Sequence, residues 1–312
     1  MSRIFDALQR SGLEQSGVAY PDMVSVATEV FEAQAPQASA HSVNPDLGPE
    51  LLSRLESASS LASAPELAAA PQRVSDVLKE FRALEVSLSP ASRLVFLTEP
   101  DSIAAEKFRF LGVRLRQLRQ NRALKKILIT STIPEEGKSL VAANLAGVLA
   151  RRKEKVLLIE GDMRRPTLAQ QFGVGRLAGL AEWLQGGMQT ASNIYRLGGP
   201  DFWFLPAGDP PANALELMQS GKLSQLMAHL STMFDWIVVD SPPLLPLADA
   251  TVWVRFTDGT LLVTREGKTE KASLKRGLEA LKKSDLLGVV LNGSSHVEHD
   301  YYYLRHPSPA TK

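Results

Sequence analysis

Short apolar runs alternate with stretches of helical spacing from Lys126 onward. The runs are Ile127–Thr130, Val156–Ile159, Phe202–Leu205, Trp236–Val239, Leu261–Thr264 and Gly288–Leu291. Near-continuous apolar strands with helices between them are typical of a parallel sheet that is covered on both faces. The pattern therefore predicts an α/β fold, a three-layer domain with a mainly parallel β-sheet.

A long helix is predicted ahead of the first of these strands. Between Ser102 and Gln120, apolar residues recur at helical spacing, namely Ile103, Phe108, Leu111, Leu115 and Leu118. The same stretch is strongly basic, with Lys107, Arg109, Arg114, Arg116 and Arg119. Two explanations of this charge stay open, a solvated helix face and an interaction surface.

The first 90 residues have a different composition. Residues 1–12 predict a short amphipathic helix, and residues 33–71 are rich in Ala, Ser and Pro, which is typical of a linker. We therefore expect a partly disordered, partly helical N-terminal arm and linker over 1–90, the α/β domain over 91–298, and a C-terminal tail over 299–312.

The charge is unevenly distributed, although the total is close to neutral. The 312 residues carry 35 basic and 34 acidic side chains, so the formal net charge of +1 gives no global field that favours nucleic acid. Residues 1–90 hold 6 of the basic and 12 of the acidic side chains, which leaves 29 and 22 for the remainder. Such a split indicates that the two parts have different roles.

Cysteine and long apolar segments are both absent from the sequence. The lack of cysteine excludes disulfides, thiolate nucleophiles, iron–sulfur clusters and cysteine-based zinc sites. No apolar run reaches the length of about 18 residues that a transmembrane helix needs, and the N-terminus does not resemble a secretory signal. We therefore expect a cytoplasmic protein that contacts a membrane peripherally or through a partner.

The first motif with clear chemistry is Ile127-Leu-Ile-Thr-Ser-Thr-Ile-Pro-Glu-Glu-Gly-Lys-Ser139, a strand and a loop that open a helix. This is the setting of a phosphate-binding P-loop, in which amides and the helix N-terminus face phosphate. Lys138 would reach the β- and γ-phosphates, Ser139 would hold Mg²⁺, and Gly137 would allow close approach. The full pattern has Gly where this chain has Thr132, so an ordinary strand-to-helix turn stays an alternative.

Two further motifs place carboxylates at the ends of predicted strands, where open α/β sheets bind ligands. Glu160 and Asp162 follow the second strand, where both would face a metal at the mouth of the P-loop, and Arg164 is placed to meet phosphate. A charged loop that caps the next helix is the alternative for this segment. Asp240 ends another apolar strand, as in a Walker B element, and would act on Mg²⁺ or its water.

The chain ends in a tyrosine cluster. Three of its five tyrosines are consecutive, Tyr301, Tyr302 and Tyr303, in a polar segment that also contains proline. A buried strand is disfavoured so close to a polar chain end. The pattern favours tyrosines that act as phosphoacceptors.

Together these motifs resemble those of the bacterial tyrosine kinases (BY-kinases) of capsule and exopolysaccharide synthesis. The resemblance runs from about Arg93 to Tyr303 and is carried by segments 131–139, 158–166 and 238–243, the stretch 206–213 and the tyrosine tail. The opening segment 1–8 is also similar to the start of such kinases. The resemblance implies ATP-dependent autophosphorylation on tyrosine, in trans between neighbouring protomers of a ring. It also implies activation by the cytoplasmic segment of a membrane-bound chain-length regulator.

The resemblance also implies roles for individual residues. The catalytic set would be Lys138, Asp162, Asp240 and Glu160, with Mg²⁺ held by Ser139, Asp162 and Asp240. ATP would be bound by Thr132, Pro134, Glu135, Glu136, Gly137, Lys138, Ser139, Leu140, Arg164 and Asn292, the last of these at adenine. The oligomer contact would involve Glu106 and Arg109.

Three positions depart from the family pattern. Glu135 stands where the family usually has Gly, Glu160 stands where it has Asp, and Gly112 replaces the second Arg of the oligomer helix. These departures keep open a second hypothesis, a nucleotide-binding scaffold of the export machinery with weakened catalysis. A third hypothesis is a ParA/MinD-like ATPase switch. Against it, Ile133 occupies the position of that branch's signature Lys, and the tyrosine cluster would have no role.

Overall fold

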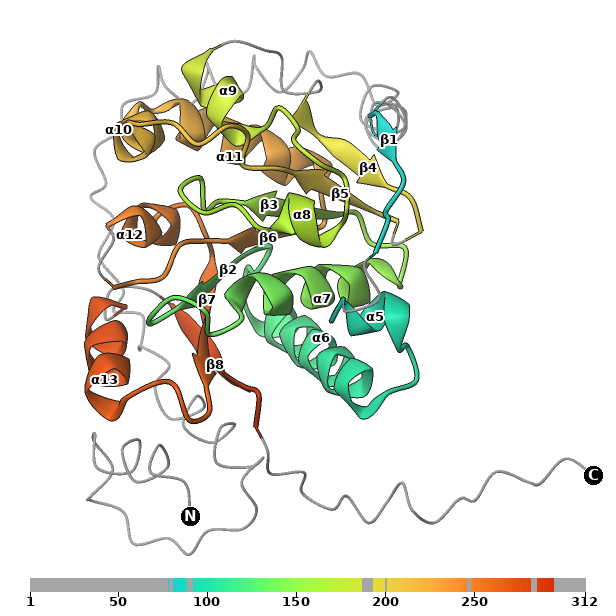
Figure 1. Ribbon diagram of the computed structural model, residues 1–312, viewed down its shortest axis with the longest axis vertical. Coiled ribbons are helices and arrows are strands. Elements are labelled where there is room, and N and C mark those ends of the chain that lie inside the picture. The colour runs from blue at the N-terminus through green and yellow to red at the C-terminus, as the bar shows by residue number, and fades with distance from the viewer. Residues whose placement is uncertain are drawn as a thin grey trace, which may run out of the picture. The chain divides into compact units, whose positions relative to one another are not determined.

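The computed structural model describes residues 78, 81–88, 92–186, 193–199, 201–245, 248–281 and 285–294. From Phe81 onward these residues belong to one unit, built on an eight-stranded sheet of order β1-β4-β5-β3-β6-β2-β7-β8 (Figure 1). The strands are β1 (Ala83–Leu84), β2 (Lys126–Ser131), β3 (Val156–Glu160), β4 (Tyr195–Leu197), β5 (Phe202–Leu205), β6 (Trp236–Asp240), β7 (Gly259–Arg265) and β8 (Leu286–Asn292).

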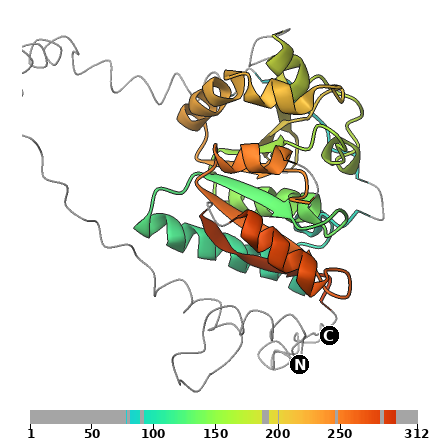
Figure 2. The same ribbon diagram turned by 90° about the vertical axis from the view of Figure 1, so that its left-hand side faces the viewer.

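Helices connect these strands and cover the sheet. They are α5 (Val95–Thr98), α6 (Ile103–Asn121), α7 (Lys138–Ala150), α8 (Leu168–Gln171), α9 (Leu180–Gln185), α10 (Ala214–Gln219), α11 (Lys222–Met233), α12 (Asp249–Val254) and α13 (Lys271–Ala280). Viewed from the side, α10 and α11 lie at one end, α6 and α13 at the other, and α12 between them (Figure 2). No helix in the described ranges is long and apolar enough to cross a membrane.

The predicted parallel α/β sheet is confirmed. All six predicted strands are present as β2, β3, β5, β6, β7 and β8, and these six run in the same direction. The predicted helix over 102–120 is α6, whose N-terminus is capped by the side chain of Ser102. The two strands that the pattern does not indicate, β1 and β4, have two and three residues, too few to show a period. β1 precedes residue 91, the expected start of the domain.

The core forms because successive residues of each central strand point to opposite faces. On one face, Ile127 and Ile129 of β2 belong to the same buried cluster as Val141 and Leu145 of α7. The central strands are fully buried along their length. Since α7 is itself buried on nearly all sides, with α5 and α6 packed over it, its first turn is held firmly against the sheet.

Parallel strands bring their carboxyl ends to one edge of the sheet. The central neighbours β3, β6 and β2 end there at Glu160, Asp240 and Ser131. The register pairs Glu160 with Asp240 and Ile129 with Asp240, so β3 and β6 end level and β2 continues two residues further. This arrangement places the three sequence motifs side by side, although they are far apart in the chain.

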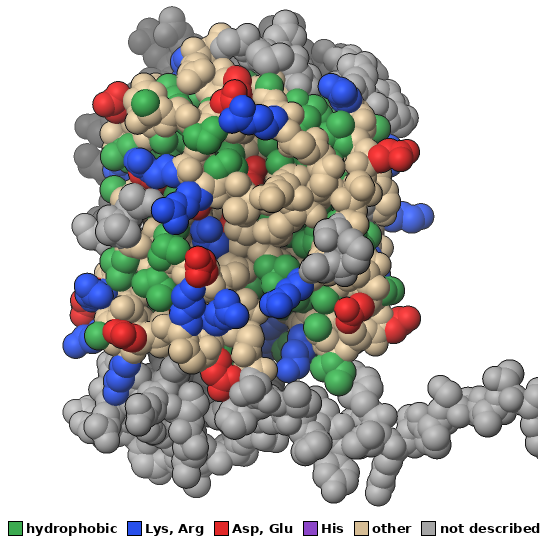
Figure 3. Space-filling model, viewed as in Figure 1, with side chains coloured by type: hydrophobic (Ala, Val, Ile, Leu, Met, Phe, Trp, Pro, Cys, Tyr) green, Lys and Arg blue, Asp and Glu red, His purple; other side chains and the backbone are tan. Residues whose placement is uncertain are grey.

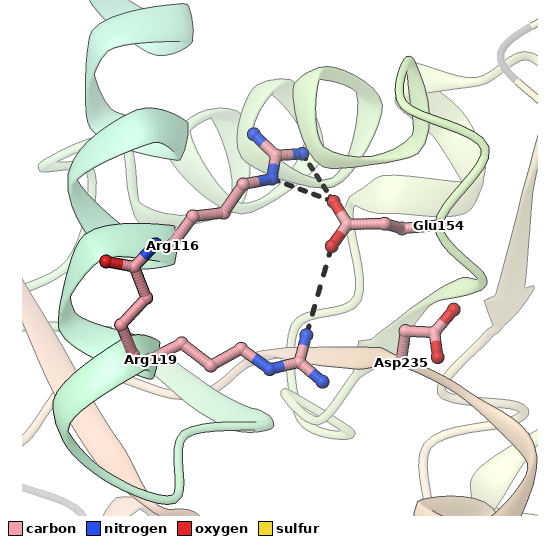
Figure 4. A pocket seen from close by; sticks show the side chains of 5 residues that line it. Arg116, Arg119, Glu154 and Asp235 are labelled. Atoms are coloured by element: carbon pink, nitrogen blue, oxygen red, sulfur yellow. Dashed lines mark hydrogen bonds and ion pairs between the residues drawn. The ribbon is translucent and has the colours of Figure 1, made fainter.

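At the opposite edge, a polar network holds α6 to the starts of β3 and β6. Arg116 binds Glu154 through Nε at 2.8 Å and Nη2 at 2.6 Å (Figure 4). The indole N–H of Trp236 donates to the other oxygen of Glu154. The guanidinium of Arg119 lies 4.6 Å from the centre of the Trp236 ring. With Asp235 these charged residues line a cavity of about 480 Å³. Part of the basic charge of α6 is therefore neutralised within the fold.

Gly147 of α7 gives a direct test of how α5 is packed. A methyl group at this position would overlap the ring of the buried Phe96. We expect Gly147→Ala to lower the free energy of unfolding by about 1–3 kcal/mol in urea denaturation, although alanine favours a helix by up to about 1 kcal/mol. Gly288→Ala is the control, because its added carbon would meet its nearest neighbour at 3.9 Å. Equal stability of the two variants would contradict this packing.

Candidate active site

The loop between β2 and α7 has the conformation of a phosphate-binding loop. Gly137 lies in the left-handed region with φ 94°, and α7 begins at Lys138 without a side-chain cap, so its first amide groups are left for a ligand. A β-carbon on Gly137 would overlap the amide of Asn292. Glycine at this position therefore meets two needs, a positive φ and close packing.

Lys138 points from the start of α7 toward the second motif. Its Nζ lies 3.3 Å from Oδ2 of Asp162, and both side chains are largely buried. The other oxygen of Asp162 accepts a hydrogen bond from the amide of Arg165 at 3.1 Å. The structure therefore brings together two of the predicted catalytic residues, from the start of α7 and the loop after β3, as an ion pair.

Asp240 lies buried beneath the same loop, with 1% of its surface exposed. Burial raises its pKa to about 7, against the lowering effects of Lys138 and a hydrogen bond with Ser139. Its Oδ1 has no hydrogen-bond partner within the described part of the chain. A buried oxygen without a partner next to a hydroxyl suits a hard cation such as Mg²⁺.

The described residues contain no group of three or more His, Cys, Asp or Glu that would hold a metal alone. Magnesium rarely uses such a cage, because it keeps several waters and binds through one or two carboxylates together with substrate phosphates. Ser139, Asp162 and Asp240 therefore fit Mg²⁺ that arrives with a nucleotide.

Glu160 binds main-chain amides, whereas the sequence predicts that it faces a metal. Its Oε1 accepts hydrogen bonds from the amides of Thr167 at 2.6 Å and Leu168 at 2.5 Å, and its Oε2 accepts one from Ala207 at 3.1 Å. Burial raises the pKa of Glu160, and these three hydrogen bonds oppose that effect. The extra methylene of Glu relative to Asp lets the carboxylate reach these amides, so its contacts favour a positioning role.

Glu136 braces the phosphate loop from inside. It is fully buried, its Oε2 accepts a hydrogen bond from the amide of Ile133 at 2.8 Å, and its Oε1 accepts one from the hydroxyl of Thr269. Its main-chain oxygen accepts a hydrogen bond from Asn292 Nδ2 at 2.9 Å. Asn292, predicted at adenine, thus supports the phosphate loop from the end of β8.

Glu135 points outward from the loop. Its side chain is 80% exposed and forms an ion pair with Lys268, which lowers the pKa of the Glu135 carboxyl. Its main-chain oxygen accepts a hydrogen bond from Arg265 at 3.3 Å. The carboxylate that departs from the family pattern is therefore turned away from the phosphate cradle and paired.

Thr132 occupies the loop position where the P-loop pattern has glycine. It is fully buried, and its Oγ1 has no hydrogen-bond partner in the described ranges. Opposite it lies Gly277 of α13, where an added β-carbon would come within 2.9 Å of that oxygen. Because Gly277 has no β-carbon, there is room for the side chain of Thr132.

The remaining predicted ATP contacts lie around this loop. Pro134 is exposed, and Leu140 is half-buried in the first turn of α7. Arg164 forms a two-point ion pair with the buried Asp249, with Nε at 2.6 Å from Oδ2 and Nη2 at 3.3 Å from Oδ1. Its guanidinium is therefore held by the start of α12.

The end of β7 and the loop that follows it contact the phosphate loop, although no sequence motif indicated them. Arg265, Lys268 and Thr269 all contact the phosphate loop, across more than a hundred residues of sequence. The signal was available, since these residues follow an apolar parallel strand and hence lie at the edge where ligands bind. They were not predicted, because they lie far along the chain from any recognised motif.

Two further predicted groups lie elsewhere. On α6, Glu106 and Arg109 form an ion pair with each other, and Arg109 also donates to the main-chain oxygen of Pro100. Gly112 is buried against Val148 of α7, where a larger side chain would crowd the helix pair. Tyr301, Tyr302 and Tyr303 lie outside the described residues, and their role stays a prediction.

Several curated relatives of the chain are tyrosine-protein kinases, although no protein-family model matches it. The tyrosine-protein kinase YwqD of Bacillus subtilis is 36% identical over 214 residues, which cover 67% of this chain and 90% of the relative. The putative tyrosine-protein kinase CapB of Staphylococcus aureus is 31% identical, with 69% of this chain and 95% of the relative covered. For the putative tyrosine-protein kinase AmsA of Erwinia amylovora, 31% identical, the chain spans only 29% of the relative's length.

Solved structures agree with these relatives. The kinase domain of the Escherichia coli tyrosine kinase ETK has a TM-score of 0.63 and 27% identity, covering 69% of this chain and 91% of that domain. The chimerical protein CapA2B2 has a TM-score of 0.62 and 31% identity, covering 70% of this chain and 97% of the other.

Proposed function

The chain belongs to the bacterial tyrosine-protein kinases, and we propose on that premise that it transfers the γ-phosphoryl group of ATP to tyrosine, including tyrosines of its own C-terminal tail. One observation carries the proposal. Lys138, Asp162 and Asp240 come from three separate motifs and meet at one phosphate loop. Positioning and charge neutralisation at such a loop are the main requirements of phosphoryl transfer.

The residues would divide the work as follows. The first amides of α7 and Lys138 would hold the phosphates, and Ser139 and Asp240, with Asp162 beside them, would hold Mg²⁺. Bound Mg²⁺ supplies neutralisation of charge on the phosphate oxygens. The tyrosine oxygen would attack the γ-phosphorus as the bond from that phosphorus to the β–γ bridging oxygen breaks and ADP leaves. Asp162 would take the phenolic proton, because Glu160 is already bound by three amides.

The wider role follows from the resemblance to kinases of capsule and exopolysaccharide synthesis. We propose that the chain regulates polymerisation and export of such a polysaccharide at the cytoplasmic face of the membrane. A membrane-bound chain-length regulator would recruit it through a cytoplasmic segment, and copies of the chain would assemble through α6 around Glu106 and Arg109. The arm over 1–80 and the tail over 299–312 would lie outside the kinase domain, since β1 belongs to its sheet.

The tail is tested by replacing Tyr301, Tyr302 and Tyr303 together by Phe. We expect purified full-length protein incubated with Mg·ATP to accumulate phosphotyrosine, and the triple variant to lose most of that signal. Nucleotide binding should stay unchanged, because the phosphate loop is intact. The measurements are phosphotyrosine immunoblotting and titration with a fluorescent ATP analogue.

Other outcomes of the same assay would point to other functions. Release of free phosphate without phosphotyrosine would indicate an ATPase switch, and nucleotide binding with neither product would indicate a scaffold. A negative result would be repeated with the regulator's cytoplasmic segment present before the kinase proposal is rejected. Undiminished phosphotyrosine in the triple variant would place the acceptor elsewhere in the chain.

A further inference from the structure

Glu135 combines two features that are uncommon at a phosphate loop. It is a non-glycine residue in the left-handed region, with φ 64°, and it adds a carboxylate to a loop built to receive anions. Strained residues at a functional site persist when their surroundings hold them in place. The contacts of Glu135 therefore identify the residues that hold it in this conformation.

Those contacts come from the end of β7 and the loop that follows it. The ammonium group of Lys268 pairs with the Glu135 carboxylate, and Arg265, the last residue of β7, donates to the Glu135 main-chain oxygen. The loop that carries Lys268 is itself anchored, since the hydroxyl of Thr269 donates to the buried Glu136 and the amide of Lys268 donates to the main-chain oxygen of Arg265 at 3.2 Å. Lys268 is thus presented to Glu135 by a fixed segment.

A bare carboxylate at position 135 would oppose nucleotide binding. Glu135 stands two residues before Gly137, in the loop whose amides face phosphate. Like charges near a protein surface repel one another, and a triphosphate carries several negative charges. Lys and Arg side chains also gather in the middle of the face seen in Figure 3, with single acidic side chains among them.

We propose that Lys268 is a positioning residue for the nucleotide, which acts through Glu135 by neutralising its carboxylate and holding it away from the phosphates. Arg265 assists by fixing the backbone of Glu135. Lys268 and Glu135 then form one functional unit, in which each residue is needed only because the other is present. This inference rests on the proposed function, since it concerns the nucleotide of that same site.

The test is a double-mutant cycle read by nucleotide binding alone. Full-length protein is titrated with a fluorescent ATP analogue as wild type, Lys268→Ala, Glu135→Gln and the double variant. We expect Lys268→Ala to weaken binding roughly tenfold because it unmasks Glu135. In the Glu135→Gln background, Lys268→Ala should weaken nucleotide binding less than about threefold, because no carboxylate is left to unmask.

Three controls make the result specific. Lys275→Ala removes an exposed lysine from α13 and should leave affinity unchanged. Lys268→Arg keeps the positive charge and should restore most of the affinity. The loss caused by Lys268→Ala should also shrink as salt rises, because exposed charges are screened. Thermal melting of each variant confirms that it is folded.

A loss that is equal in both backgrounds would overturn the proposal, since Lys268 would then act on the nucleotide directly. No loss in the single variant would overturn it as well. Failure of the proposed function would appear differently, as wild-type protein that binds the nucleotide without forming phosphotyrosine.

Discussion

Replacing Lys138 by Met is expected to lower the rate of phosphotyrosine formation by at least about 100-fold, the usual cost of removing a group that stabilises charge in a transition state. Lys138 is the cation at the start of α7, and its Nζ lies 3.3 Å from Asp162 in a largely buried setting. Methionine preserves the length of the side chain and removes the charge. The measurement is the initial rate of phosphotyrosine appearance with saturating Mg·ATP.

The matched control for this variant is Lys275→Met, which removes an exposed lysine from α13. Its rate should stay within about twofold of wild type, because surface changes away from a site have small effects. A Lys138→Met rate within a few-fold of wild type would mean that the phosphate loop does not carry the chemistry. The proposed function would then have to be abandoned.

Replacing Asp240 by Asn is expected to have two opposite effects. Phosphotyrosine formation should fall by at least about 100-fold, because a neutral amide cannot neutralise Mg²⁺. The nucleotide-free protein should become more stable at pH 8, because the amide removes a buried charge whose Oδ1 has no partner in the described structure. The measurements are the phosphotyrosine rate and urea denaturation without nucleotide or metal.

The stability effect should depend on pH. Burial raises the pKa of Asp240 from 3.8 to about 7, so between these values the folded protein holds a proton that the unfolded chain has released. The contribution of Asp240 to the free energy of unfolding therefore falls as pH rises from about 4 to about 7. At about 1.36 kcal/mol per pKa unit, the loss is on the order of 4 kcal/mol.

The variant lacks this titration, so its stability advantage should be present at pH 8 and should shrink as pH is lowered toward 4. Asp209→Asn serves as the control, since Asp209 is a largely exposed carboxylate in a surface ion pair. The free energy of unfolding of Asp209→Asn should stay close to that of wild type at both pH values. An Asp240→Asn protein that is less stable than wild type at pH 8 would show that the buried carboxylate is compensated in the folded state.

The centre of the sheet could be predicted from the sequence because continuous apolar runs, a local pattern, identified the six parallel strands. Lys138, Asp162 and Asp240 follow or end such strands, and the observed strand order places them at one edge of the sheet, whereas their roles stay a prediction. The short strand β4 could not be predicted in this way, because its three residues are held by pairing with β5.

The direction of individual side chains was also beyond the sequence. Glu160 and Arg164 were expected to face metal and phosphate, but their partners Ala207 and Asp249 lie 47 and 85 residues away. Glu135 stood out as a departure from the family pattern. Its partner Lys268, 133 residues away, became visible only in three dimensions. Such contacts depend on how loops meet after the sheet has formed.

The contact between Thr132 and Gly277 affects how the sequence can vary at these two positions. The β-carbon that a P-loop pattern forbids at position 132 is present here, and it is absent from the facing position on α13. The two positions hold a fixed volume between them, so a change at one constrains what the other can accept. A sequence pattern for the loop alone detects only the change at position 132. Covariation between positions 132 and 277 would detect both changes together.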